Sequence, residues 1–240
     1  QMRERHAQQS GLASRLRTWT SWQKAERVER SLLRRFHVST VVSAAEVTYL
    51  KRLSGPAGAC VEVIPNGVDC TYHRPGIAAK QPGSLVYNGA LTYSVNYDAM
   101  RYFVQDVLPL VRRDCPGTRL RITGSTTGVD LVPLEQHHVE FTGYVQDIRP
   151  IVAGSAVCVV PLRQGGGTRL KILEAMALGT AVVSTSKGAE GLDVVDGVHL
   201  LIADEPVGFA SATRSLLQDA GLRERLVINA RRLVEERYDW

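Results

Sequence analysis

Short apolar segments alternate with helical stretches along most of the chain, and this alternation constrains the fold more than any other feature of the sequence. The segments predicted as strands are residues 40–43, 60–64, 85–88, 119–123, 139–142, 156–160, 181–184 and 200–203. The main helical stretches are residues 96–113, 147–153, 168–178, 206–219 and 222–237. Because the strands do not alternate with polar residues, both faces of the sheet must be covered. The sequence therefore predicts an α/β fold with a Rossmann-like, doubly wound parallel sheet.

A crowd of Pro and Gly between residues 65 and 83 indicates a linker between two parts of the chain. The boundary is expected near residues 69–75, which leaves residues 73–240 for one complete α/β domain. Residues 1–72 are too few for a domain of this class and are expected to be the C-terminal remnant of another α/β domain. Because the sequence starts at Gln1 and not at Met, we expect it to be a piece of a longer chain.

The first 36 residues carry the excess positive charge of the chain. They hold nine Lys or Arg against three Glu, whereas the whole chain has a net charge of +5. Apolar residues of this segment fall at helical spacing, namely Leu12, Leu16, Trp19, Trp22, Ala25, Leu32 and Phe36. The pattern favours a helix that packs this apolar stripe on a core and exposes a basic face. Contact of residues 1–36 with an anionic membrane surface remains the alternative, and nucleic-acid binding is not expected.

Several protein classes are excluded by missing patterns. No apolar run approaches the roughly 18 residues that a membrane-spanning helix needs. The four cysteines have no Cys-x-x-Cys spacing and no His at metal-ligand spacing, so neither a metal site nor a secreted disulfide framework is expected. We expect a cytoplasmic protein. Neither a Gly-x-Ser-x-Gly elbow nor a P-loop motif is present, which argues against a hydrolase and a P-loop NTPase.

The stretch from residue 156 to residue 184 carries the strongest chemical signal. A buried strand ends at Pro161, three successive glycines follow at residues 165–167, and a helix is predicted to start at Thr168. This order places backbone N–H groups and the positive end of a helix dipole beyond the carboxyl end of a strand. Open parallel sheets bind anionic ligands at that position, so the sequence predicts a phosphate-binding loop.

Lys171 and Glu174 lie with Gly167 on one face of the predicted helix. The opposite side is apolar, with Leu170, Ile172, Leu173, Met176 and Ala177. Lys171 is suited to neutralise a diphosphate, and Glu174 to accept hydrogen bonds from ribose hydroxyls, whereas a solvated ion pair is the simpler alternative. Arg169 falls on the apolar side of the predicted helix. Two roles are possible for it, a contact with phosphate or a salt bridge to the sheet edge.

Five segments in a fixed order resemble the nucleotide-sugar-binding half of glycosyltransferase family 4. They are IPNGVD at residues 64–69, LVYNGALTYSVNYDA at 85–99, FTGYVQDI at 141–148, GGGTRLKILEAMALGTAVVST at 165–185 and KGAEGL at 187–192. The resemblance covers about residues 40–240. It implies a GT-B fold, of which this chain would hold the C-terminal half.

The resemblance implies roles for residues outside the glycine-rich loop. Gly89 matches the glycine of the first turn of the domain, where the donor diphosphate approaches the backbone. Tyr144 and Val145 match a loop whose main chain pairs with the nucleobase. The Lys that the family usually has after this glycine is absent, and Asn96 is the nearest polar candidate.

Within the loop and helix, Glu174 matches the second glutamate of the family's Glu, seven residues, Glu motif. The first glutamate would stand at position 166, which is Gly166. That carboxylate contacts the donor sugar in relatives, so this departure affects how the sugar is held. Gly166, Gly167, Thr168 and Arg169 complete the expected donor-binding set.

The function that the resemblance implies is hexosyl transfer from a nucleoside-diphosphate sugar, UDP- or GDP-linked, to a glycan or lipid-linked acceptor. It implies retention of anomeric configuration, no metal and no other cofactor, with Lys171 and Glu174 as the catalytic residues. A position at the inner face of the membrane is expected if residues 1–36 contact lipid. A sugar-nucleotide epimerase and a non-catalytic nucleotide-sugar-binding relative stay open as alternatives. The piece alone is expected to be inactive.

Overall fold

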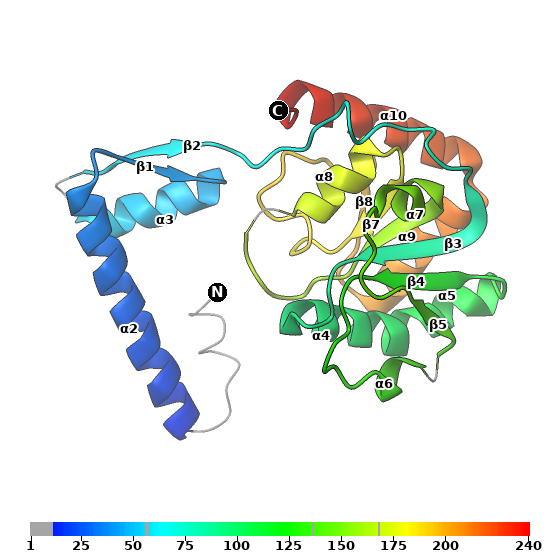
Figure 1. Ribbon diagram of the computed structural model, residues 1–240, viewed down its shortest axis with the longest axis horizontal. Helices are drawn as coiled ribbons and strands as arrows, with labels where there is room; N and C mark the ends of the chain where they lie inside the picture. The colour runs from blue at the N-terminus through cyan, green and yellow to red at the C-terminus, as the bar shows by residue number, and fades with distance from the viewer. Residues whose placement is uncertain (1–11, 56–57, 136, 168) are drawn as a thin grey trace. The chain divides into compact units, whose positions relative to one another are not determined.

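The computed structural model describes residues 12–55, 58–135, 137–167 and 169–240 (Figure 1). Its contacts divide the chain into two compact units. Unit 1 comprises Gln1–Asn66 with Gly166–Thr168, and unit 2 comprises Gly67–Gly165 with Arg169–Trp240. None of the described helices is both long enough and apolar enough to cross a lipid bilayer.

Unit 1 is built from two helices and a two-stranded parallel sheet. Its elements are α2 (Leu12–Arg35), β1 (Val38–Val41), α3 (Ala44–Ser54) and β2 (Cys60–Val63). The strands pair in parallel. Leu33, Leu53 and Val61 form a small core between the helices and the sheet. The Tyr49 hydroxyl adds a 2.8 Å hydrogen bond from α3 to Glu29 of α2.

The apolar stripe of α2 does not pack as predicted. Leu16, Trp19, Leu32 and Phe36 are all exposed, and residues 1–11 of the basic segment lie outside the described part of the chain. The physical reason is the small size of the unit: among the described side chains of this helix, Leu33 alone is buried in its core, and Trp22 and Ala25 are partly buried. The expectation of core packing is therefore wrong for Leu16, Trp19, Leu32 and Phe36.

Unit 2 contains the predicted parallel sheet. Its strands are β3 (Gln81–Asn88), β4 (Arg119–Thr123), β5 (Val139–Phe141), β6 (Ser155–Val160), β7 (Ala181–Ser184) and β8 (Leu201–Ile202). They run in the order β5-β4-β3-β6-β7-β8, and every pair is parallel. The strand order reverses between β3 and β6, and the carboxyl ends of such a pair are where this architecture binds ligands.

Helices cover both faces of this sheet, as the apolar strands require. They are α4 (Ser94–Tyr102), the π-helix η2 (Phe103–Val107), α5 (Leu108–Asp114), α6 (Val132–Glu135), α7 (Arg149–Gly154), α8 (Leu170–Ala177), α9 (Pro206–Gln218) and α10 (Ala220–Arg237). In Figure 1, α4 and α5 lie on one side of the strands and α7, α8 and α10 on the other. Along β3, Leu85 and Tyr87 face the first layer and Val86 faces the second.

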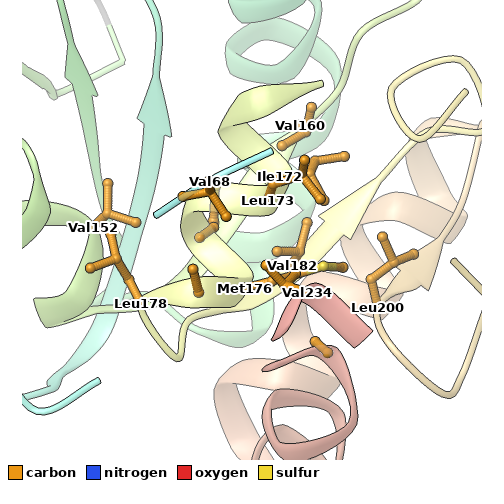
Figure 2. Close-up of a cluster of buried hydrophobic side chains, with 14 of the residues drawn as sticks. Val68, Val152, Val160, Ile172, Leu173, Met176, Leu178, Val182, Leu200 and Val234 are labelled. Atoms are coloured by element: carbon orange, nitrogen blue, oxygen red, sulfur yellow. The ribbon is translucent and has the colours of Figure 1, made fainter. Parts of the chain in front are cut away.

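The core beneath α8 fixes the position of that helix. Ile172, Leu173 and Met176 are fully buried, and Figure 2 shows them packed near Val182 and Val234. This layer accounts for the apolar side of the helix that its 3.6-residue periodicity predicts. The opposite side of α8 is then free to carry polar groups.

The long helix predicted over residues 96–113 is interrupted by the π-helix. The backbone N–H of Leu108 bonds the carbonyl of Phe103, five residues back. Pro109 follows and has no N–H with which to continue an α-helical ladder, so a wider turn accommodates it. The helical stretch predicted over residues 96–113 is therefore helical throughout, with a π-helical segment at its centre.

Candidate functional site

The helix after the glycine loop begins two residues later than predicted. α8 starts at Leu170, because Arg169 has φ −88° and ψ 59°, outside the helical region. Thr168, the predicted start, lies outside the described residues. The free N–H groups of the first turn are therefore those of Leu170 and Lys171, and no described residue accepts them. The shift also leaves Leu170 41% exposed, so its predicted place in the core is wrong.

Arg169 joins two loops of unit 2. Its side chain is buried, and its Nη2 donates to the carbonyl oxygens of Gly165 at 3.1 Å and Lys187 at 3.0 Å. Glu190 lies 3.7 Å from the same nitrogen and 2.7 Å from the Lys187 ammonium. Arg169 thus holds the end of the loop before α8 against the loop after β7.

Lys171 reaches the carboxyl end of β3. Its ammonium donates to Tyr87 Oη at 2.7 Å and to Asn96 Oδ1 at 3.2 Å. The Tyr87 hydroxyl in turn donates to Asn96 Oδ1 at 2.6 Å, and Asn96 Nδ2 donates to the Ala90 carbonyl at 2.9 Å. Burial is the main cause that lowers the pKa of Lys171 to about 8, and the positive charge of Arg169 adds to it.

Glu174 stands one turn further along the same face of α8. Its Oε2 accepts a 2.9 Å hydrogen bond from Asn88 Nδ2, at the end of β3. Burial raises the pKa of Glu174, while the charges of His73 and Lys171 and the bond from Asn88 oppose that rise. Tyr87, Asn88, Asn96, Lys171 and Glu174 form a connected group at the strand end, which we call the Lys171 cluster.

Gly89 is required by this cluster. A Cβ at this position would lie 2.9 Å from Lys171 Nζ, 3.0 Å from Asn96 Nδ2 and 3.2 Å from Tyr87 Cε1. Real Cβ atoms are essentially never found so close to another atom, so a side chain here would displace the ammonium. The glycine predicted to admit a diphosphate to the backbone also admits the Lys171 side chain.

The other predicted residues lie apart from these contacts. Tyr144 and Val145 follow β5 in a loop, where the Tyr144 side chain is 82% exposed. Gly124 N donates to the Gly143 carbonyl at 3.0 Å and ties this loop to the one after β4. Gly166 and Gly167 group with unit 1 and are not part of the Lys171 cluster in unit 2.

Sequence reasoning missed Tyr87, Asn88 and His73. Tyr87 and Asn88 are buried polar residues at the end of a strand that is otherwise apolar from Leu85. Polar side chains at the carboxyl end of a central parallel strand are themselves a signal of a site. His73 gave no signal, because it lies in the Pro- and Gly-rich linker.

The sequence matches a known protein family over more than half of its length. The model described as Glycosyl transferases group 1 matches residues 82–219. A glycogen synthase of Mycobacterium tuberculosis is 30% identical over 98% of this chain and 58% of its own length. A phosphatidyl-myo-inositol mannosyltransferase of the same species is 29% identical over 89% of this chain and 60% of its own. The chain thus spans about three fifths of the length of these curated relatives.

Solved structures share the fold at low sequence identity. Anabaena HepE in complex with UDP and glucose superposes with a TM-score of 0.74 at 19% identity, over 90% of this chain and 63% of its own. Staphylococcus aureus TarM in complex with UDP gives a TM-score of 0.73 at 16% identity, over 90% of this chain and 44% of its own. The C-terminal domain of a Francisella tularensis group 1 glycosyl transferase gives 0.57 at 22%, over 72% of this chain and 99% of its own. By its sequence match, this chain belongs to the group 1 glycosyl transferases, glycosyltransferase family 4, and by its topology unit 2 has the architecture of the C-terminal half of a GT-B fold.

Proposed function

We propose that unit 2 binds a nucleoside-diphosphate sugar and that the complete protein transfers its hexosyl group to a glycan or lipid-linked acceptor. The observation that carries the proposal is the Lys171 cluster at the carboxyl end of β3, where the strand order reverses. The relatives support it: one is a glycogen synthase, another a phosphatidyl-myo-inositol mannosyltransferase, and HepE is bound to UDP and glucose. We propose a UDP- or GDP-linked sugar as the donor that the Lys171 cluster binds.

Lys171 is proposed to hold the donor diphosphate. An ammonium has three hydrogens, and Tyr87 and Asn96 take two of them. The third is available for a phosphate oxygen at the Gly89 turn. The N–H groups of Leu170 and Lys171 at the start of α8 add the positive end of a helix dipole. These groups lie where charge develops on the departing diphosphate, so they stabilise the transition state.

Glu174 is proposed to hold the ribose. Asn88 occupies its Oε2, and its Oε1 accepts no hydrogen bond from a described residue. Glu174 Oε1 can therefore accept hydrogen bonds from two adjacent sugar hydroxyls. Asn88 acts as a positioning residue, because it fixes the carboxylate through the other oxygen.

The remaining donor contacts are proposed from the family pattern. The main chain at Tyr144 and Val145 would pair with the base. Gly166, Gly167 and Thr168 would line the path of the sugar and diphosphate, and Arg169 would position their loop through the Gly165 carbonyl. With glycine at position 166, no carboxylate from that position contacts the sugar.

The proposed reaction is a retaining transfer without a metal. The bond between the anomeric carbon and the diphosphate oxygen breaks, and a bond from that carbon to the acceptor oxygen forms on the same face. The acceptor proton leaves with the diphosphate. Residues 1–72 are proposed as the end of the acceptor-side domain, so this piece alone would not complete the transfer. Formation of an epimerised sugar by the complete protein in the absence of an acceptor would contradict transfer and favour an epimerase.

Calorimetric titration of the chain with UDP, GDP, ADP and TDP tests donor binding. We expect saturable binding of one nucleotide and a loss of about tenfold or more in Glu174→Ala, since a hydrogen bond to a charged group is removed. Glu140→Ala is the control, because Glu140 forms an exposed ion pair with Arg121 on the β4–β5 side of the sheet. Failure of all four nucleotides to bind, or equal affinities of the two variants, would contradict the assignment.

Peripheral contact with the cytoplasmic face of an anionic membrane is part of the same proposal. On α2, the basic residues Arg15, Arg17, Lys24 and Arg27 are exposed, as is the apolar Trp19. Such a surface is attracted to anionic lipid. Co-sedimentation with vesicles should require anionic lipid and fall with salt. Equal binding to neutral vesicles would contradict the electrostatic contact.

A further inference from the structure

A cavity of about 280 Å³ lies within unit 2 at the amino ends of the central strands. Gln81 and Ala156 line it from the starts of β3 and β6, and Ala181 lines it from the start of β7. Arg223 and Val227 close it from the first half of α10. Asn88 and the rest of the Lys171 cluster are at the carboxyl end of β3, so this cavity is separate from the proposed donor site. We call it the amino-edge cavity.

An irregularity in the sheet makes room for the amino-edge cavity. The register of β3 against β6 shifts between Gln81 and Leu85, and Gly83 has φ 71°. Ser84 Oγ replaces the missing ladder contacts, because it donates to the Gln81 carbonyl at 2.5 Å and accepts from Ala156 N at 3.0 Å. The small side chain of Ala156 then leaves the space beside the strands unfilled.

Two cations line the cavity, and no carboxylate of a described residue is bonded to either. Lys80 Nζ donates to the Ser155 carbonyl at 3.1 Å and to Thr180 Oγ1 at 2.9 Å, which leaves one ammonium hydrogen unused among the described contacts. Arg223 Nη1 donates to the carbonyls of Leu216 and Leu217, the latter at 3.0 Å. No described residue accepts from Arg223 Nη2 or Nε. Burial and, to a smaller extent, the charge of Arg223 lower the pKa of Lys80 to about 8.

One acid, Glu224, is among the lining residues, but it is exposed and makes no ion pair within the described chain. The cavity thus combines two cations with an apolar wall formed by Leu217 and Val227. Lys80 is exposed and Arg223 half-buried, and both keep N–H donors that no described residue uses, so an anion that enters would gain charge-assisted hydrogen bonds beside an apolar wall.

We propose that the amino-edge cavity binds a small organic anion. Its carboxylate or phosphate would contact Lys80 and Arg223, and its short apolar body would lie against Leu217 and Val227. The volume of about 280 Å³ lies at the lower end of the range for ligand pockets and suits a small ligand. The site is independent of the proposed donor chemistry.

Titration of the ¹⁵N-labelled chain with butyrate and with propyl phosphate tests the proposal, with butyramide as the neutral analogue. We expect saturable amide shifts at Gln81, Ala156 and Ala181 with a Kd of about 1 mM, the affinity that so few atoms allow. Butyramide should bind at least about tenfold more weakly, since it lacks the charge. The anion with the lower Kd identifies the acid group. Failure of both anions to saturate by about 50 mM would overturn the proposal.

Two matched variants of α10 separate a cation site from general surface charge. Arg223→Gln should weaken the better anion about tenfold, whereas Arg225→Gln, an exposed arginine that does not line the cavity, should change it less than about twofold. Lys80→Met should also lose binding. If Lys80→Met does not fold, Ala220→Leu provides the second variant, because it fills space at the rim. Equal affinities for Arg223→Gln and Arg225→Gln would overturn the site.

Discussion

The two ends of the unit 2 sheet each hold a lysine that is hydrogen-bonded to the protein, half-buried at Lys171 and exposed at Lys80, and the two lysines are bonded differently. Lys171 at the carboxyl end is bonded by the side chains of Tyr87 and Asn96. Lys80 at the amino end is bonded by the Ser155 carbonyl and the Thr180 hydroxyl. Burial lowers the pKa of both to about 8. The difference teaches that a lysine with a lowered pKa does not by itself mark a donor site.

The hydrogen-bond acceptors of Lys171 and Lys80 distinguish the two ends of the sheet. A side-chain network can exchange one hydrogen bond for a ligand while the backbone stays in place. A bond to a strand carbonyl instead links Lys80 to the sheet itself. We therefore expect changes at Lys171 to affect nucleotide binding and transfer, and changes at Lys80 to affect the amino-edge cavity and the fold.

The largest expected effect is that of Lys171→Met on transfer by the complete protein. Loss of the cation beside the diphosphate should cost about 2 to 4 kcal/mol of transition-state stabilisation. The measurement is kcat/KM with the preferred donor. Lys51→Met, on an exposed position of α3, is the control and should leave the rate unchanged. A rate for Lys171→Met within about threefold of wild type would remove Lys171 from the mechanism.

Gly89→Ala should have the next largest effect. The new Cβ would meet Lys171 Nζ at 2.9 Å and Asn96 Nδ2 at 3.0 Å, so the cluster must shift. We expect about 1 to 3 kcal/mol lower stability from overpacking and weaker nucleotide binding. Denaturant unfolding and calorimetry measure the two effects. Gly117→Ala is the control, because a Cβ there meets nothing within 4 Å. Similar losses in both variants would contradict the role of Gly89.

The pH dependence of stability should report both lysines. A pKa lowered to about 8 in the folded chain means that the unfolded chain binds more protons between about pH 8 and 10.4, so each lysine makes stability rise with pH there. Relative to Lys171→Met, wild type should gain roughly 1 kcal/mol per pH unit over pH 8.5–9.5. The gain relative to Lys80→Met should be smaller, because Lys80 is exposed and its charge is screened by solvent. Denaturant unfolding across this range measures the difference.

Repeating the unfolding experiment with a saturating nucleotide separates the contributions of Lys171 and Lys80 to the pH dependence of stability. A bound diphosphate favours the charged form of Lys171 and should remove its share of the pH slope, while the share of Lys80 persists. If the nucleotide instead removes the Lys80 share, the two ends of the sheet have been assigned the wrong way round.

The smallest expected effect is that of Tyr87→Phe. It removes one of two described side-chain acceptors of Lys171 and should cost about 1 kcal/mol in nucleotide binding. Calorimetry with the preferred nucleotide measures the change. Tyr97→Phe is the matched control, because its hydroxyl bonds the Asp130 carbonyl in an exposed position. A larger loss for Tyr97→Phe would contradict the network.

Much of the fold could be predicted from local sequence pattern. Two predicted strands, 119–123 and 181–184, have the same bounds as β4 and β7. Residues 181–183 are continuously apolar, as a parallel strand buried on both faces requires, whereas β4 alternates Arg119 and Arg121 with Leu120 and Ile122. The stripe of α2 shows the limit of such patterns, because periodicity gives the apolar face of a helix but not whether a partner covers it.

The candidate site could be predicted only in part. The spacing of Lys171 and Glu174 places them on one helix face, which requires no knowledge of the tertiary fold. Tyr87, Asn88 and Asn96 join them through contacts 75 to 86 residues apart in sequence, which periodicity does not encode. Lys80 lies in the linker before β3, and the register shift that opens its cavity has no local signature.

The most direct test of the central claim is a ¹H–¹⁵N titration of the chain with UDP, followed by GDP if UDP does not bind. The account predicts saturable shifts at the amides of Asn88, Gly89, Leu170 and Lys171, around the carboxyl end of β3. The amides of Gln81 and Ala181 should not shift. Saturable shifts confined to Gln81 and Ala181, or none with either nucleotide, would contradict the assignment of the carboxyl end as the donor site.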